Sequence, residues 1–167
     1  MKKNFWTVLS VCVLLFLIGC VGPSGTLSAN ELAAEDLFTL NDLEGNPTAL
    51  ADVLKQNKAI LLNFWASWCS PCREEIPDFI RIQKFYSGKG FTILGVNVGE
   101  SQKKVSGAVQ KLGINYPVLL DEEMTVAQNY HVVGIPTSYL ISSDGKVLGA
   151  YHSYSEELAE DIRKALK

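Results

Sequence analysis

Trp68-Cys69-Ser70-Pro71-Cys72 directly follows the apolar run Ala59-Ile60-Leu61-Leu62-Asn63-Phe64-Trp65. The run is typical of a strand that is buried on both faces, and a helical pattern extends from Cys69 to about Tyr86. Pro71 falls in the first turn of that helix, where its missing N–H costs little. The first sulfur would therefore lie among the free N–H groups of the helix start, which favour a thiolate. The second sulfur lies one turn further on, so the stretch predicts a thiol pair suited to reversible disulfide exchange.

The segments around this stretch alternate between strand and helix patterns. We expect a second buried strand over 91–98, then a helix that Ser101 caps and Gly113 ends. The strand–helix–strand order implies parallel pairing through a right-handed crossover. The predicted fold class is an α/β three-layer sandwich around a central mixed sheet. The other expected elements are an N-terminal β-hairpin from strands at 37–40 and 48–50, short helices over 51–55 and 124–130, a second hairpin from strands at 137–141 and 146–151, and a last helix capped by Ser155.

Length and composition agree with one globular domain and an N-terminal addition. The chain has 167 residues, of which 47% are hydrophobic and 20% charged, and its formal net charge is -3. These values are ordinary for a folded domain. No basic patch or Lys/Arg run in the sequence suggests nucleic-acid binding, so we expect no nucleic-acid partner.

The N-terminus has the pattern of an export signal. Lys2 and Lys3 precede an apolar stretch over 5–21, and Leu17-Ile18-Gly19-Cys20 resembles a bacterial lipobox. We expect residues 1–19 to be a signal peptide or an uncleaved membrane anchor, with both possibilities open. Cys20 would be lipidated, 20–33 would form a flexible tether, and 34–167 would form the domain. The predicted location is the bacterial cell membrane, with the domain on the extracytoplasmic side.

The cysteine count agrees with export. The four cysteines are Cys12, Cys20, Cys69 and Cys72. Cleavage would remove Cys12 and lipidation would block Cys20. One pair would then remain in a compartment where an odd free thiol is a liability.

Two motifs carry a family resemblance. Phe64-Trp65-Ala66-Ser67-Trp68-Cys69-Ser70-Pro71-Cys72 and Gly134-Ile135-Pro136-Thr137 resemble the active-site motif and the cis-proline loop of the thioredoxin superfamily. The stretches 68–77, 96–101 and 116–121 are similar to the TlpA/ResA-like membrane-anchored thiol-disulfide oxidoreductases. The resemblance covers residues 34–167 and implies a thioredoxin-like fold.

The resemblance also assigns roles to the residues of these motifs. Cys69 would be the nucleophile and Cys72 the resolving thiol of a redox-active disulfide. Pro136 would follow a cis peptide bond opposite the cysteines, although generic X-Pro bonds are mostly trans. The backbone of Ile135, Pro136 and Thr137 would bind the substrate chain and keep metals off the thiols.

Neighbouring residues complete the predicted site. Trp68 would form part of the docking surface, whereas we expect Trp65 in the core. Glu75 lies three residues beyond Cys72, on nearly the same helix face, and a buried carboxyl there would exchange a proton with the Cys72 sulfur. Asn63 departs from the buried aspartate of general thioredoxins, which transfers proton handling towards Glu75. We expect Glu100 to be a loop residue.

The resemblance implies an activity and partners. The chain would reduce disulfides of client proteins, such as apocytochrome c during cytochrome maturation. A membrane thiol donor of the CcdA or DsbD type would restore the thiols. No cofactor beyond the cysteine pair is expected. The sequence leaves open whether the pair acts as reductant, oxidant or isomerase.

Other readings of the cysteines remain. A zinc site needs about four ligands, and only His131 and His152 add imidazoles, without paired ligand spacing. We therefore expect no metal. A purely structural disulfide is open, as is an ordinary turn role for Pro136. A peroxiredoxin-like peroxide reductase would need a Pro-x-x-x-Thr-x-x-Cys motif, which this sequence lacks. A copper chaperone or binding module would need Cys-x-x-x-Cys with a supporting histidine, which this sequence also lacks.

Overall fold

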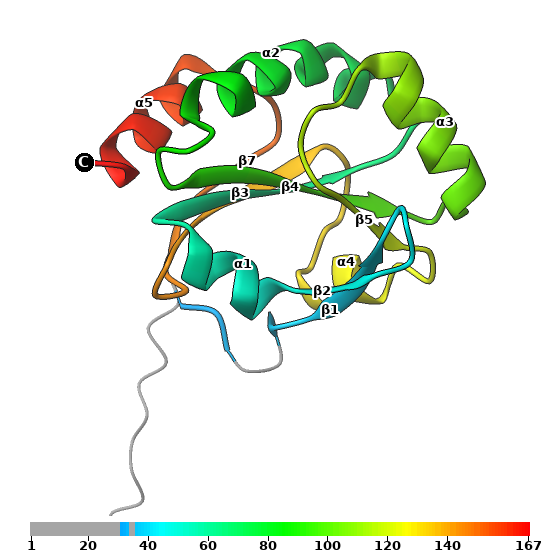
Figure 1. Cartoon of the computed structure of the whole chain (residues 1–167), viewed down its shortest axis with the longest axis horizontal. Helices are drawn as coiled ribbons and strands as arrows, with labels where there is room; N and C mark the ends of the chain where they lie inside the picture. The colour runs from blue at the N-terminus through cyan, green and yellow to red at the C-terminus, as the bar shows by residue number, and fades with distance from the viewer. Residues whose placement is uncertain (1–30, 34–35) are drawn as a thin grey trace, which may run out of the picture.

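The computed structural model describes residues 31–33 and 36–167 (Figure 1). Within this range one mixed sheet of seven strands, ordered β2-β1-β5-β4-β3-β6-β7, lies between two layers of helices. The strands are β1 (Thr39–Asp42), β2 (Pro47–Ala49), β3 (Ala59–Trp65), β4 (Phe91–Val98), β5 (Val118–Asp121), β6 (Thr137–Ser142) and β7 (Val147–Tyr151). The helices are α1 (Leu50–Gln56), α2 (Ser70–Tyr86), α3 (Gln102–Leu112), α4 (Thr125–Asn129) and α5 (Glu156–Ala165). Helices α2, α3 and α5 cover one face of the sheet, and α1 and α4 lie on the other, which confirms the predicted fold class.

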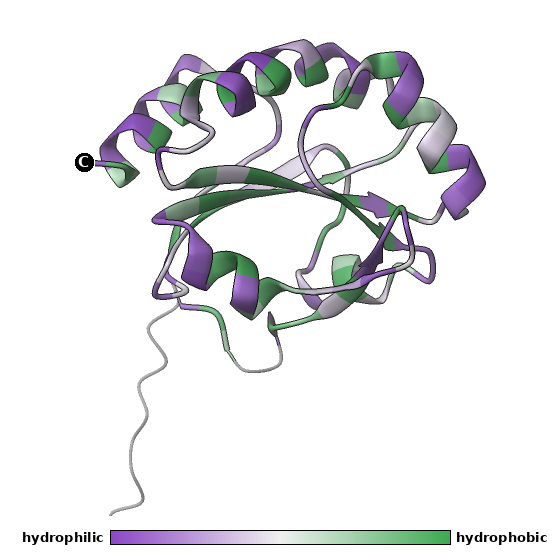
Figure 2. Cartoon of the chain, in the orientation of Figure 1, coloured by the Kyte–Doolittle hydropathy of each residue, from purple (hydrophilic) through white to green (hydrophobic). Residues whose placement is uncertain are grey.

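The centre of the sheet is the predicted pair of buried strands. β3 and β4 run parallel, in register from Ala59 opposite Phe91 to Trp65 opposite Asn97. All seven residues of β3 are buried. Figure 2 shows the apolar strands enclosed between helices whose outer sides are polar. Burial from both faces explains why β3 lacks the alternating pattern of a half-exposed strand.

Helix α2 is held against β4 by apolar packing and by one buried amide. Its inner face buries Cys72, Ile76, Phe79 and Gln83. The Gln83 side chain accepts a hydrogen bond from the backbone N–H of Ile93 at 2.8 Å. This bond fixes the end of α2 that lies far from the cysteines.

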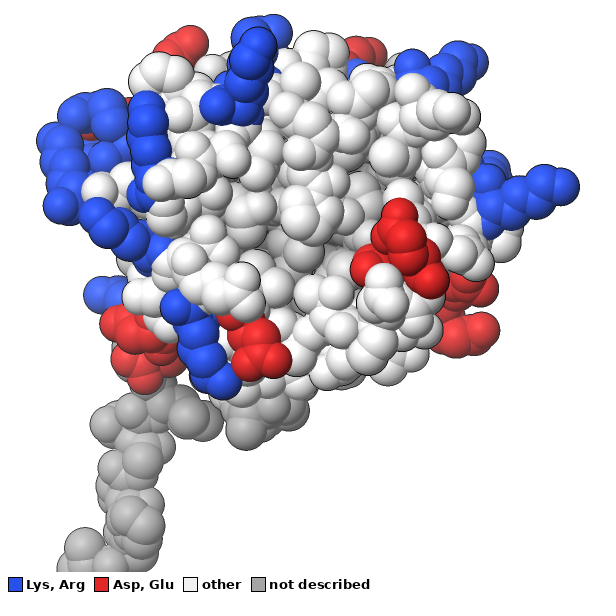
Figure 3. All heavy atoms as spheres, viewed as in Figure 1, with Lys and Arg blue, Asp and Glu red and all other residues white. Residues whose placement is uncertain are grey.

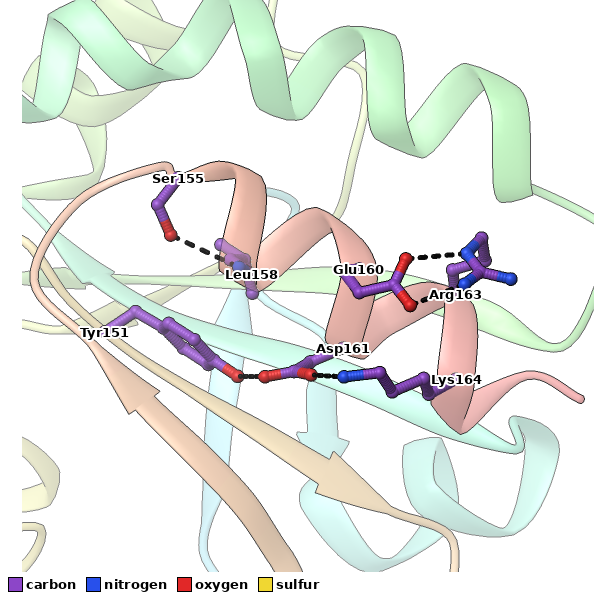
Figure 4. A network of polar contacts seen from close by, with 7 residues as sticks. All are labelled: Tyr151, Ser155, Leu158, Glu160, Asp161, Arg163 and Lys164. Atoms are coloured by element: carbon purple, nitrogen blue, oxygen red, sulfur yellow. Dashed lines mark hydrogen bonds and ion pairs between the residues drawn. The ribbon is translucent and has the colours of Figure 1, made fainter.

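The last helix is anchored at its start and along its length (Figure 4). Ser155 Oγ accepts a hydrogen bond from Leu158 N at 3.2 Å, which confirms the predicted cap. The Tyr151 hydroxyl donates to Asp161 Oδ2 at 2.8 Å and ties β7 to α5. Gly113 ends α3 in the left-handed conformation, with φ 68°, as its position predicted.

Three local predictions need correction. The first strand covers 39–42 instead of 37–40, because its pairing with β2 and β5 involves the later residues. Strand β5 was not predicted, because four residues carry little pattern and its strand form depends on pairing with β4 and β1. Ser101 occupies the N-cap of α3, but its side chain makes no capping hydrogen bond.

The first described residues are attached to the turn between β6 and β7. Glu31 forms an isolated bridge with Lys146, and Leu32 N donates to Gly145 O at 3.0 Å. Within the described part of the chain, no helix combines the length and apolarity needed to cross a membrane. The predicted signal segment 1–19, the lipidation site Cys20 and the tether up to residue 30 lie outside the described residues.

Candidate active site

The two predicted cysteines form a disulfide at the start of α2. The S–S distance is 2.11 Å and the Cα atoms are 5.3 Å apart. Cys69 is the N-cap residue, and its Sγ accepts a hydrogen bond from Cys72 N at 3.2 Å. Cys72 is fully buried, whereas Cys69 retains 4% of its surface. An incoming group would therefore reach the Cys69 sulfur first, and the helix N–H groups would stabilise a thiolate there.

The Pro136 loop lies against the disulfide. The Ile135–Pro136 peptide bond is cis, and Ile135 O lies 3.7 Å from Cys69 Sγ. Pro136 and Thr137 are buried, and Thr137 Oγ1 donates to Gly134 O at 2.7 Å. Thr137 thus supports the loop from inside, while Ile135 is partly exposed beside the sulfur.

An apolar hollow of about 230 Å³ opens beside this loop. The Trp68 side chain borders it and is 63% exposed, and Val133 is 99% exposed. Such a surface suits an apolar side chain of a bound polypeptide. The lining residues are Trp68, Val98, Met124, Ala127, Gln128, Val132, Val133, Gly134 and Ile135.

Glu75 is a buried carboxyl on the inner face of α2, one turn beyond Cys72. Asn63 Nδ2 donates both to Glu75 Oε1 at 3.0 Å and to Ser138 Oγ at 2.9 Å. Burial raises the pKa of Glu75 to about 7, and the Asn63 hydrogen bond opposes this increase only in part. Since its pKa lies near neutrality, Glu75 has the chemistry of a proton carrier. Glu75 is therefore buried, as predicted, and Asn63 is hydrogen-bonded within the core.

Glu100 lies in a loop, as expected, but its side chain is buried. Its carboxylate accepts hydrogen bonds from Ser67 N (2.6 Å), Ser67 Oγ (2.7 Å) and Asn97 Nδ2 (2.9 Å), and Lys104 Nζ lies 2.8 Å away. Burial alone would raise the pKa of Glu100, but the contacts with Lys104, Ser67 and Asn97 outweigh it and lower the pKa to about 2. Glu100 is therefore ionised and fixes Ser67.

Ser67 is held from its other side as well. Arg73 Nη1 donates to Ser67 O at 3.0 Å, so the N–H, the hydroxyl and the carbonyl of Ser67 are all bonded. Trp68 and Cys69 follow this residue directly. The hydrogen bonds that Glu100 and Arg73 make to Ser67 therefore fix the backbone position from which Trp68 and Cys69 continue. The only sequence signal for these bonds was the position of Glu100 at the end of a buried strand.

The other titratable side chains do not assemble a metal site. Among the residues that the structure describes, no group of three or more His, Cys, Asp or Glu side chains converges on one point. His131 is exposed, with φ 53°, and His152 Nδ1 lies 3.3 Å from Thr137 Oγ1. Trp65 is in the core, as predicted.

A disulfide at a helix start, facing a cis-proline loop across the end of a mixed sheet, defines the class of thioredoxin-like dithiol–disulfide proteins. The comparisons with known proteins agree. The model of the AhpC/TSA family matches residues 32–150. Thiol-disulfide oxidoreductase ResA of Bacillus subtilis (strain 168) is 35% identical over 175 residues, which cover 100% of this chain and 97% of that protein. ResA of Geobacillus thermodenitrificans (strain NG80-2) is 35% identical over 155 residues, covering 88% of this chain and 87% of that protein.

Solved structures show the same fold. The thioredoxin domain of a thiol-disulfide oxidoreductase from Bacteroides vulgatus superposes with a TM-score of 0.73 at 27% identity, covering 83% of this chain and 99% of that one. A thiol:disulfide interchange protein of the thioredoxin family from Chlorobium tepidum TLS gives 0.68 at 35% identity, covering 78% and 94%. The chain belongs to the ResA-like thiol-disulfide oxidoreductases of the AhpC/TSA family.

Proposed function

We propose that this protein is a membrane-tethered, extracytoplasmic reductase of client disulfides. The observation that carries the proposal is the Cys69–Cys72 disulfide at the start of α2, with Ile135 O 3.7 Å from the outer sulfur and the buried Glu75 one turn further along the helix. The structure holds the oxidised form, which is the product of client reduction.

The reaction starts from the reduced pair. The Cys69 thiolate attacks one sulfur of a client disulfide, forms a mixed disulfide and releases a client thiolate. The Cys72 thiol then loses its proton, for which Glu75 is the nearby acceptor, and attacks the Cys69 sulfur. This second step releases the other client thiolate and leaves the Cys69–Cys72 disulfide. Two electrons pass to the client, and a thiol donor must return them.

Binding of the client would use the surface around the disulfide. The backbone beside Pro136 would pair with an extended client segment, as one strand pairs with another, and Trp68 would contact its side chains. The apolar hollow next to Trp68 and Ile135 supports this arrangement. Apocytochrome c, whose haem-binding cysteines must be reduced before haem attachment, is the proposed client. A CcdA- or DsbD-type membrane protein is the proposed donor.

Membrane attachment is part of the same proposal. The apolar stretch over 5–21 and the lipobox-like Leu17-Ile18-Gly19-Cys20 support an anchor at Cys20 or an uncleaved N-terminal span. Labelling of the protein with a palmitate analogue in a bacterial host, and its loss in Cys20→Ser, would support the lipidated form.

The direction of electron flow follows from the reduction potential. We expect the Cys69–Cys72 couple, in a soluble form that begins at Glu31, to lie near the roughly -270 mV of thioredoxin. A value near the roughly -120 mV of DsbA would make the protein an oxidant and would rule out the maturation role.

The order of the two cysteines is tested by trapping. Cys72→Ala should accumulate a mixed disulfide between Cys69 and apocytochrome c, whereas Cys69→Ala should trap nothing and reduce no disulfide. Trapping through Cys72 instead would reverse the assigned roles. Peroxide consumption by the reduced wild-type protein at a rate comparable to client reduction would favour a peroxide reductase.

A further inference from the structure

The end of the domain opposite the disulfide gathers several separate segments. Lys58 precedes β3, and its N–H donates to Gly90 O at 2.7 Å, just before β4. The Lys58 carbonyl accepts from Ser143 N at 2.9 Å, in the turn between β6 and β7. Its Nζ lies 3.4 Å from Leu166 O, at the end of α5. Since the cysteines follow the other end of β3, this end points away from the active site.

Positive charge collects at this end. Of the eight cations there, three are paired within their own helices: Lys55 with Asp52, Arg163 with Glu160 and Lys164 with Asp161. Figure 4 shows the two pairs on α5. Figure 3 shows Lys and Arg gathered on the side of the domain where Figure 1 places the C-terminus. The other five are exposed lysines without an ion-pair partner in the described part of the chain: Lys58, Lys84, Lys89, Lys146 and Lys167.

Few carboxylates oppose these five lysines. Besides the three that pair with Lys55, Arg163 and Lys164, the carboxylates at this end are Glu31, Asp144 and the terminal carboxylate, so the end keeps a small excess of positive charge. The domain as a whole has the opposite sign. Only Lys2 and Lys3 of the 15 cations precede residue 31, whereas all 18 acidic residues lie at residue 31 or beyond it. Exposed glutamates gather at the active-site end, on α2 two residues after Cys72, in the first turn of α5 and after β5: Glu74, Glu122, Glu123, Glu156 and Glu157.

An aromatic side chain accompanies the lysines. Phe85, in the last turn of α2, is 62% exposed, and Lys89 Nζ lies 3.7 Å from the centre of its ring. An aromatic ring next to lysines is the composition of surfaces that rest at the membrane–water boundary.

The chain also leaves the domain at this end. Glu31 pairs with Lys146, and Leu32 is bonded to Gly145 in the same turn. The 11 residue-to-residue steps from Cys20 to Glu31 can span at most about 37 Å. An anchor at Cys20 therefore keeps this end close to the bilayer.

We propose that this basic end, defined by Lys58, Lys84, Phe85, Lys89 and Lys146, docks on the anionic lipid headgroups of the membrane that carries the anchor. Docking turns the Cys69–Cys72 pair away from the bilayer, towards extracytoplasmic clients. The inference rests on the membrane attachment proposed above. Each lysine adds a weak attraction, and the short tether supplies the high effective concentration that makes weak attraction sufficient. The domain as a whole is acidic, so an anionic membrane would not attract the domain from solution. The positive charge at one end can only orient a domain that the tether already holds at the membrane.

Lysine footprinting tests this orientation. The chain from residue 20 onward, with Cys20→Ser and an N-terminal His tag in place of residues 1–19, would be attached to nickel-chelating lipid, so that the result does not depend on the native anchor. Vesicles of phosphatidylcholine alone would be compared with vesicles that contain one third phosphatidylglycerol. Acetylation rates of individual lysines would be read by mass spectrometry. Lys103 and Lys111 on α3, away from the basic end, are the internal controls.

We expect phosphatidylglycerol to slow acetylation of Lys84, Lys89 and Lys146 about threefold or more relative to Lys103 and Lys111. At about 0.5 M NaCl, where charges are screened within a few ångström, the protection should disappear. The triple variant Lys84→Gln, Lys89→Gln, Lys146→Gln should also lose protection at Lys58, while its disulfide reductase activity in solution stays unchanged.

Equal acetylation on both lipids, or protection of Lys103 and Lys111 instead, would overturn the docking proposal. If Lys84, Lys89 and Lys146 were protected to the same extent on phosphatidylcholine alone, their contact with the membrane would not depend on anionic lipid, and the proposal would also be overturned. Absence of the untagged full-length protein from the cell membrane fraction would contradict the native anchor alone. Docking and anchoring therefore fail in distinguishable ways.

Discussion

Substituting Glu75→Gln should remove a pH dependence of folding stability that we expect of the wild-type protein between pH 4.5 and about 7. Burial raises the pKa of Glu75 from 4.5 to about 7 in the folded state. Between these values the folded state keeps a proton that the unfolded chain has released. The free energy of unfolding of the oxidised protein therefore falls as the pH rises through this window.

The size of the effect follows from the two pKa values. Below pH 4.5 both states hold the proton, and above about pH 7 neither does, so the change is confined to the window. At about 1.4 kcal/mol per pH unit, the interval corresponds to a loss of about 3 kcal/mol. The cause is the cost of an ionised carboxylate inside the protein, where Asn63 supplies a single hydrogen bond to Oε1.

Urea unfolding at pH about 5 and about 8 measures this directly. A soluble, oxidised form that begins at Glu31 is suitable, because the thiols then do not titrate. The glutamine amide lacks a partner and destabilises the variant by about 1–3 kcal/mol, but equally at both pH values. The quantity to compare is therefore the pH difference for each protein. The matched control is Glu74→Gln, an exposed neighbour on α2.

A Glu75→Gln protein that retained the full wild-type difference between the two pH values would refute the reasoning. Loss of this pH difference in the Glu74→Gln control would refute the assignment to Glu75 as well. The same substitution should remove the limb near pH 7 from the pH profile for resolution of the mixed disulfide.

Three further predictions concern residues around the site and on the scaffold. Glu100→Gln should destabilise the protein by about 3 kcal/mol, because it breaks the buried contacts to Ser67; unchanged urea unfolding would contradict this. Trp68→Ala should lower kcat/KM for a protein disulfide about tenfold and leave Tm unchanged, since this side chain is exposed. The variant should reduce a small-molecule disulfide as fast as the wild type does. An unchanged kcat/KM for the protein disulfide would argue against client docking at Trp68. Ser155→Ala should lower the free energy of unfolding by about 1 kcal/mol through loss of the cap to Leu158, measured by calorimetry, and should leave the rate of client reduction unchanged; an unchanged Tm would contradict the role of the cap.

Local chemistry made a large part of the protein predictable. The spacing of Cys69 and Cys72 alone places two sulfurs on one turn, and the preceding apolar run predicts a buried strand. The helix ends at Gly113 and Ser155 follow from backbone freedom and from side-chain capping, which need only neighbouring residues. Strand β5 was missed because its four residues become a strand through pairing with β4 and β1.

The sequence by itself therefore determined the cysteine pair, the buried central strands and the fold class, because these depend on spacing, side-chain type and periodicity within short segments. Only the tertiary structure decided what surrounds the pair. It brings Ile135 O to Cys69, across 66 residues of chain, and encloses Glu75 with Asn63. It also buries the Glu100 carboxylate, which accepts a hydrogen bond from the backbone N–H of Ser67. Contact across long sequence separations and the loss of water around a carboxyl arise only when the segments pack together, and no local pattern records them.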